Sequence, residues 1–321
     1  MNKIRFTLLI IGVGIIVLGA VSLVGAQGER GVGISPLTFE LTANPGDVLT
    51  NQVKVYNPSD AVIGLKMEIE DFTVAGEIGH VKLEPAETET YSIARWITFE
   101  PEEFSLQPGE QKFVNFTISL PENAEPGGHY GSVIAGTTAV VGGGVTGAAV
   151  AGRVGSLVLL SVAGNTKEEL GVKDFNVGTL GENEEFTPRN YFEQGPVTFQ
   201  TRFENTGTIH VKPRGYVTIT NWLGKKVADV EFSQRNVLPN SVRKIETSWN
   251  QKWLWAGKYT ATLSGSYGMS NIPLKPAVIT FWAFPWKAGV GILVVLILFI
   301  LSRRRWIAAF RILIKGEKAL K

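Results

Sequence analysis

The chain has 321 residues and contains no cysteine. Disulfide bonds, thiol catalysis and metal sites with cysteine ligands are therefore excluded. A chain of this length is expected to form two domains with additional segments. Domains of more than about a hundred residues can be held together by core packing alone. With 31 basic and 29 acidic residues the overall charge is nearly balanced, so the composition gives no sign of a nucleic-acid-binding protein.

Catalytic and metal-binding patterns are also scarce. The histidines, His80, His129 and His210, lie far apart in the sequence and none has the spacing of a metal ligand. No serine-hydrolase, zinc-protease or P-loop motif occurs. The glycine-rich run 142–155 precedes no helix pattern, so we interpret it as a flexible hairpin loop or a weak strand pair rather than a phosphate site. We predict no catalytic, cofactor-binding or metal-binding residues; the binding residues stay unassigned.

Only the carboxylates suggest a catalytic or calcium-binding alternative. They lie in and beside one predicted strand: Asp60, Glu68, Glu70 and Asp71. Such groups serve glycan hydrolases or bind calcium when they converge, and a hydrolase needs two carboxyl groups within roughly 5–10 Å in one cleft. The favoured interpretation is a solvated strand face and its following turn. The acidic, loop-rich segment 83–103 could likewise meet a basic partner.

The stretch Phe104–Thr138 carries the clearest structural signal. Lys112–Leu120 alternates, with Val114, Phe116, Ile118 and Leu120 on one face, which predicts a half-buried strand. The prolines and glycines of Pro121–Gly128 end that strand, and His129–Thr138 predicts another. Two strands joined by an irregular connection are typical of one corner of an immunoglobulin-like sandwich.

Turn and strand patterns recur along the chain. A Pro-Gly turn with an acidic residue precedes a strand at Asn44–Asp47 and again at Gln107–Glu110. Later, Leu238-Pro239-Asn240 precedes Ser241–Trp249, and Gly257–Tyr267 matches Gly128–Gly136 in placement and pattern. This degenerate repeat predicts an all-β fold of two tandem immunoglobulin-like β-sandwich domains, over 31–163 and 168–282.

Three tryptophans, Trp249, Trp253 and Trp255, cluster before the matching strand of the second predicted domain. Core and corner packing is the favoured interpretation of this cluster. The alternative is an exposed aromatic ridge for binding.

Both ends of the chain carry apolar runs. Residues 1–26 have basic Lys3 and Arg5, an apolar stretch and small residues up to Ala26, which predicts a signal peptide, or else a signal anchor. Residues 283–302 are expected to form a C-terminal transmembrane helix, followed by a basic cytoplasmic tail over 303–321. The predicted localisation is the cell membrane, single-pass, with residues 27–281 extracellular.

The layout resembles the WxL-interacting proteins of bacterial cell surfaces. The residues that carry the resemblance are Ile34-Ser35-Pro36, Val53–Pro58, Phe104–Leu106 with Pro108-Gly109, Pro121, Pro126–Tyr130 and Val197–Gly207. The resemblance covers nearly the whole chain and implies two immunoglobulin-like domains, a membrane anchor and no enzymatic activity. It also implies that the first domain associates with peptidoglycan and the second with partner or host proteins.

We therefore predict a non-catalytic, membrane-anchored cell-surface scaffold or adaptor. It would bind a cell-envelope partner, either a surface protein or a wall polymer such as peptidoglycan, through strand edges and loops. The alternatives are an accessory subunit of a membrane protein complex and a cell-wall glycan hydrolase. No cofactor and no nucleic acid are expected as partners.

Overall fold

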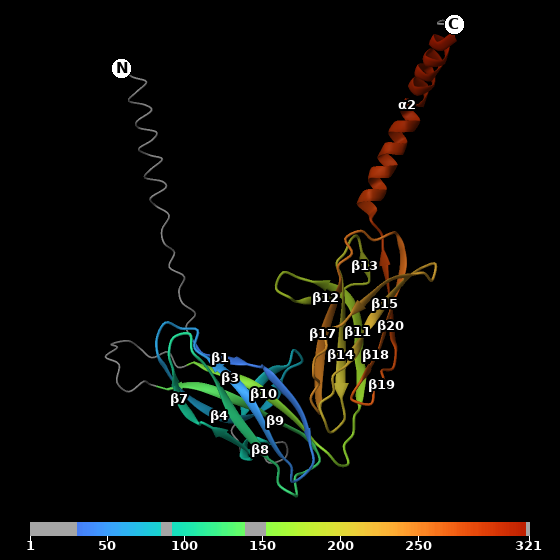
Figure 1. Ribbon diagram of the computed structural model, residues 1–321. Coiled ribbons are helices and arrows are strands. Elements are labelled where there is room, and N and C mark those ends of the chain that lie inside the picture. The colour runs from blue at the N-terminus through green and yellow to red at the C-terminus, as the bar shows by residue number, and fades with distance from the viewer. Residues whose placement is uncertain (1–30, 85–91, 139–151, 319–321) are drawn as a thin grey trace, which may run out of the picture.

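The structure is a computed structural model and describes residues 31–84, 92–138 and 152–318. Two β-sandwich domains follow one another along the chain, and a helix extends from the far end of the second domain (Figure 1). The predicted signal segment 1–26 and residues 142–151 of the glycine-rich run lie outside the described residues. The end of that run, from Arg153, belongs to a strand.

The first domain is built from two facing sheets. Its small sheet has the order β1-β3-β8-β6, with bounds Gly33–Ser35, Val48–Tyr56, Gln111–Ser119 and Ile97–Glu100. Its large sheet has the order β2-β10-β9-β4-β5, with β7 pairing beside β4. The bounds are Thr38–Ala43, Arg153–Val162, Gly127–Thr138, Ile63–Ala75, His80–Glu84 and, for β7, Glu103–Leu106. The short helix η1 covers Ala94–Trp96.

The core of the first domain lies between these sheets. Val114, Phe116 and Ile118 of β8 are fully buried, as their alternation predicts, and meet Leu65 and Met67 of β4. The corner predicted after Leu120 carries the chain from β8 in the small sheet to β9 in the large one. Strand β9 is buried on both faces for most of its length, so something must cover the outer face of the large sheet.

The second domain repeats the plan. Its small sheet has the order β12-β11-β14-β17, with bounds Phe186–Pro188, Leu170–Leu180, Val197–Asn205 and Ser241–Trp249. Its large sheet has the order β13-β20-β18-β15-β16, with β19 beside β18. The bounds are Tyr191–Phe192, Ala277–Ala283, Gly257–Tyr267, Arg214–Asn221, Lys226–Glu231 and, for β19, Ile272–Pro273. Its core is rich in aromatic rings, among them Phe199, Phe203 and Phe281.

A buried asparagine occupies the same place in both domains. Asn57 follows β3, and its Nδ2 donates to the carbonyls of Ala61, Leu106 and Gln107. Asn205 ends β14, and its Nδ2 donates to Ile209 and Val237. Each side-chain amide thus links the end of its strand to the segment that precedes the neighbouring strand of the same sheet. The two domains therefore share a structural device as well as a strand pattern.

The prediction of a transmembrane helix over 283–302 is wrong. Strand β20 continues to Ala283, and helix α2 runs over Trp286–Lys318. No helix within the described part of the chain is long and apolar enough to cross a membrane. The uncharged run between Lys287 and Arg303 would extend only about 22 Å as a helix, less than a hydrocarbon layer of about 30 Å.

The predicted fold class and the predicted localisation both depended on this helix. The predicted fold class included the transmembrane helix, so as a whole it is wrong, although the described residues do form two β-sandwich domains. The single-pass membrane localisation depended on the same helix and is wrong with it. The extracellular assignment of 27–281 and the cytoplasmic assignment of the tail lose their basis.

Replacement of Asn205 should destabilise the second domain. Asn205→Ala removes the donor for two buried carbonyls and the acceptor for the Gly207 amide. Buried polar groups without partners cost about 1–3 kcal/mol each, so the free energy of unfolding should fall by roughly 2–4 kcal/mol. Urea unfolding measures the change. The exposed Asn190→Ala serves as control, and equal stability of the two variants would contradict the role given to Asn205.

Candidate functional site at the junction of the two domains

Part of the outer face of the large sheet of the first domain is covered by the second domain. Phe72, Tyr130 and Leu159 lie side by side on this face and form one buried cluster with Leu238 of the second domain. On β4 the core residues Leu65 and Met67 occupy odd positions, whereas Phe72 occupies an even one, so its side chain points to the opposite face. This contact explains the burial of Tyr130 on the outer face of β9.

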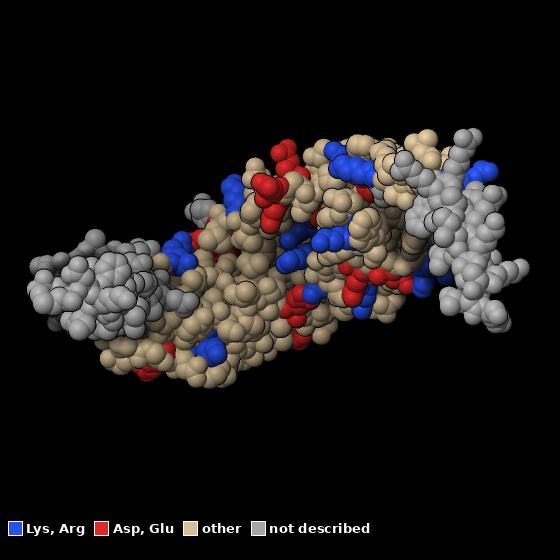
Figure 2. Space-filling view, turned by 90° about the horizontal axis from the view of Figure 1, so that it is seen from above, with Lys and Arg blue, Asp and Glu red and all other residues tan. Residues whose placement is uncertain are grey.

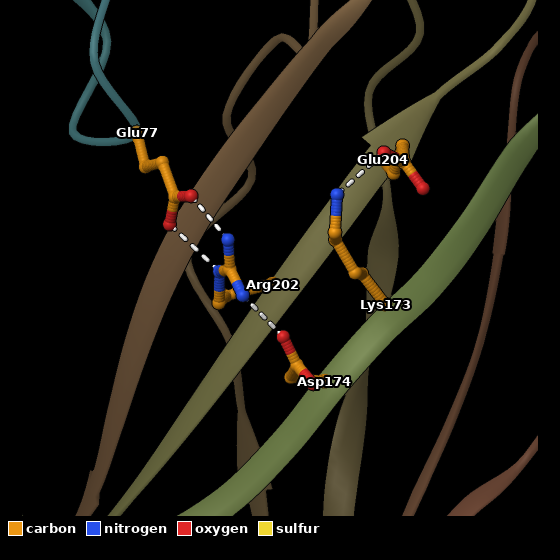
Figure 3. Close-up of polar contacts among 5 residues, drawn as sticks. All are labelled: Glu77, Lys173, Asp174, Arg202 and Glu204. Carbon is orange, nitrogen blue, oxygen red and sulfur yellow. Dashed lines mark hydrogen bonds and ion pairs between the residues drawn. The ribbon is translucent and has the colours of Figure 1, made fainter.

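An ion-pair cluster lies at one edge of the junction (Figure 3). Glu77, in the turn between β4 and β5, receives two hydrogen bonds from the Arg202 guanidinium, one of them 2.7 Å long. Arg202 also pairs with Asp174, and nearby Lys173 pairs with Glu204 at 2.7 Å. The hydrogen bonds from Arg202 hold the pKa of Glu77 below its usual range. Figure 2 shows charged side chains of both signs gathered about the middle of the molecule.

Another polar cluster lies around Glu40 of β2. The Glu40 carboxylate accepts hydrogen bonds from Lys212 Nζ at 2.5 Å and Asn236 Nδ2 at 2.7 Å. Burial alone would raise the pKa of Glu40, but these hydrogen bonds bring it below its usual value. His210 meets the Tyr130 ring edge-on, with 5.7 Å between ring centroids. Burial lowers the pKa of His210 to about 4, so the imidazole is neutral at pH 7.

Two clefts open at this junction, and Glu40, Lys212 and Asn236 line both. The first has a volume of about 370 Å³ and also contacts His210. The second has a volume of about 270 Å³ and is lined by both Arg235 and Arg243. Asn236 Oδ1 is buried and has no hydrogen-bond partner among the residues that the structure describes. The junction is therefore hollow as well as charged, which favours binding rather than a closed interface.

Strand β17 presents a free edge beside the junction. It pairs with β14 on one side only. On the other side the Lys244 amide donates to the Glu77 carbonyl of the first domain at 2.7 Å. Amides alternate in direction along a strand, so those of Glu246 and Ser248 also point outward. Within the described residues no backbone group accepts from either of them.

The residues considered from the sequence do not form a catalytic or metal site. His80, His129 and His210 lie apart, and no group of metal-ligating side chains occurs among the described residues. His129 packs on Trp96, with 4.6 Å between centroids, and its ring nitrogens face the carbonyls of Ser92 and Glu125. His129 is thus a packed residue near the start of β9.

The predicted carboxylates divide between two faces of β4. Glu68 and Glu70 pair with Arg153, at 3.0 and 2.5 Å, on the open outer face. Asp71 points to the other face, where its Oδ1 accepts the amides of Ile93 and Ala94. None of these residues lines either junction cleft. Glu68 and Glu70 are paired with Arg153 and Asp71 lies on the opposite face, so we do not carry the hydrolase alternative further.

The three tryptophans of the second domain differ in burial. Trp249 is buried in the core and packs against Tyr259, with 5.9 Å between centroids, as the favoured interpretation predicts. Trp253 and Trp255 are 73% and 85% exposed.

Sequence reasoning missed the residues of the junction. Glu77 and Arg202 are 125 positions apart, and Lys212 and Glu40 are 172 apart. Local patterns carry no information on such contacts.

Comparisons with known proteins give only distant likenesses. No family model matches the chain, and the search of curated proteins finds no match. Among solved structures, the class 5 fimbriae chaperone CfaA is 12% identical with a TM-score of 0.38, covering 78% of this chain and 99% of that one. The CupB2 chaperone of Pseudomonas aeruginosa is 9% identical with a TM-score of 0.35, covering 78% and 100%.

A third structure is the CsuC–CsuE chaperone–tip adhesion subunit pre-assembly complex of Acinetobacter baumannii. It is 13% identical with a TM-score of 0.36, covering 79% of this chain and 100% of that chain. We draw nothing about the function of this chain from structures so distant.

Removal of the Glu77 charge should loosen the orientation of the domains. Because the chain lacks cysteine, Asp60→Cys and Lys225→Cys place one spin label in each domain without background labelling. Adding Glu77→Gln breaks the pairing with Arg202, and the distance distribution measured by double electron–electron resonance should broaden. Glu122→Gln, an exposed change in the first domain, should leave it unchanged. An identical distribution for Glu77→Gln would contradict the orienting role.

His210 should make the protein less stable in acid. Its pKa in the folded protein is about 4, below the value of about 6.5 in an unfolded chain. Between these values the unfolded chain binds more protons, so stability falls as the pH is lowered. From pH 7.5 to 4.5 this one group should cost about 2–3 kcal/mol.

The loss is measured by urea unfolding at the two pH values. His210→Gln should lose less stability over that range than the unaltered chain, by the amount given. His80→Gln, at an exposed position, is the control. An unchanged pH dependence in His210→Gln would contradict the buried, neutral state of this imidazole.

Proposed function

We propose that this protein is a non-catalytic binding protein that takes up an extended segment of a partner polypeptide as an additional strand beside β17. The free edge of β17 carries this proposal. Unpaired strand edges accept partner strands, whose main-chain hydrogen bonds supply affinity while alternate side chains supply selectivity. The partner is thus a protein with an exposed extended segment.

The other edge strands are poorer candidates. Strands β1, β6, β12 and β13 are very short, with bounds Gly33–Ser35, Ile97–Glu100, Phe186–Pro188 and Tyr191–Phe192. Strands β2, β5 and β16 are edges as well, with six, five and six residues. Charge does not distinguish β16 from β17, since each carries a salt bridge along the strand. Strand β17 is the longest edge strand, with nine residues over Ser241–Trp249, and among the described residues only its Lys244 amide is occupied on the outer side.

The resemblance to WxL-interacting proteins favours an envelope protein as the partner. Nothing in the described structure supports binding of a wall polymer, so we do not propose it. The accessory-subunit alternative relied on the membrane span and is not retained.

The test uses peptides selected from a random displayed library against the full chain. A peptide that binds as a strand should slow hydrogen exchange of the Glu246 and Ser248 amides by at least tenfold. Ser248→Pro removes one outward amide and should weaken binding at least tenfold. Ser248→Ala keeps that amide and loses only the side-chain hydrogen bond to Thr198, so it should bind as the unaltered chain does.

Thermal unfolding must first show that Ser248→Pro remains folded. If it does, peptides that bind it as tightly as the unaltered chain would overturn the proposal. Protection confined to residues away from β17 would also overturn it.

A further inference from the structure

The smaller junction cleft holds two arginines whose charges no carboxylate offsets. Arg235 precedes β17, Arg243 belongs to it, and both line the cleft. Neither side chain forms an ion pair or hydrogen bond with any described residue. By contrast, Arg153 and Arg202 are each held by two carboxylates. Arg235 and Arg243 thus bring two positive charges without an ion-pair partner among the described residues to one cleft.

The Arg243 guanidinium is held in place by the first domain. It lies directly against Gly79, where an added Cβ atom would fall 1.5 Å from Nη1. Burial, together with the nearby positive charge of Arg235, lowers the pKa of Arg243. Two guanidinium groups therefore line the same cleft. A guanidinium presents its N–H donors as a planar fork that matches the oxygens of a carboxylate or phosphate.

The rest of the cleft has both polar and apolar walls. Phe72, Leu159 and Leu238 form its floor, and Val81 at its edge is 41% exposed. The other charged pair, Lys212 with Glu40, is mutually satisfied. The cleft thus combines two positive charges without partners and an apolar floor, in about 270 Å³. A few charged groups over apolar walls are typical of small-molecule sites.

We propose that this cleft binds a small amphipathic anion. The carboxylate or phosphate of the ligand accepts hydrogen bonds from Arg235 and Arg243, and a compact apolar body lies on Phe72, Leu159 and Leu238. This site is separate from the β17 edge, since it uses side chains rather than outward amides. The two proposals can therefore fail independently.

Isothermal titration of the full chain with phenyl phosphate tests the site. Benzoate replaces the phosphate by a carboxylate, inorganic phosphate lacks the apolar body, and phenol lacks the charge. Phenyl phosphate or benzoate should bind at least tenfold more tightly than either inorganic phosphate or phenol. The proposal is overturned if phenol binds as tightly as both anions, or if no probe binds.

Variants then test whether the ligand binds at the two arginines. Arg235→Gln and Arg243→Gln should each lower the affinity about tenfold or more, since each removes a charged hydrogen-bond donor. Arg243→Lys keeps the charge and loses the fork, so it should also weaken binding. Arg189→Gln, at an exposed site in the second domain, and Ser248→Pro should leave binding unchanged. Unchanged affinity in Arg243→Gln, or an equal loss in Arg189→Gln, would refute the site.

Discussion

The packing of Leu238 against Phe72, Tyr130 and Leu159 is the contact on which the rest of the structure depends. It brings the second domain onto a sheet face that would otherwise be open to solvent. Apolar burial is not directional, so this contact draws the domains together without fixing their angle. The smaller cleft lies beside this contact, since Phe72, Leu159 and Leu238 line it.

The angle between the two domains is set by polar contacts around this apolar cluster. Exposed ion pairs are worth little as a source of stability, because water screens them and ordering the side chains costs entropy. They are directional, however, and Glu77 is held by the Arg202 guanidinium at one edge while Glu40 is held by Lys212 and Asn236 at another. Their contribution is orientation. Buried apolar contacts and polar clamps therefore perform different tasks at the same junction.

The strands could be predicted from the sequence because their causes are local. The alternation around Phe116 gives the buried face of β8, and the turns before β8 and β17 mark corresponding places in two domains. The equivalent roles of Asn57 and Asn205 could have been suspected, since each follows an alternating strand. Local patterns are sufficient where a residue's partner is fixed by the period of its own strand.

The junction could not be predicted in this way. Phe72 continues an apolar strand, and nothing local shows that it faces a second domain rather than its own core. The acidic residues of β4 attracted attention, whereas Glu77 in the next turn did not, because its partner lies 125 positions away. At the other end, the apolar composition of 283–302 predicts a span, but the uncharged run after Lys287 is shorter than a hydrocarbon layer.

The turn between β4 and β5 links the features of the junction. The Glu77 side chain binds Arg202, its carbonyl accepts the outward amide of Lys244 in β17, and Gly79 lies against the Arg243 guanidinium. One short turn of the first domain thus contacts both proposed sites. It occupies the Lys244 amide at the edge of β17, and it lies against the Arg243 guanidinium in the smaller cleft. Because these contacts share one backbone, a change in domain angle must alter both sites together. The geometry of binding is consequently a property of the pair of domains, and neither sandwich alone contains it.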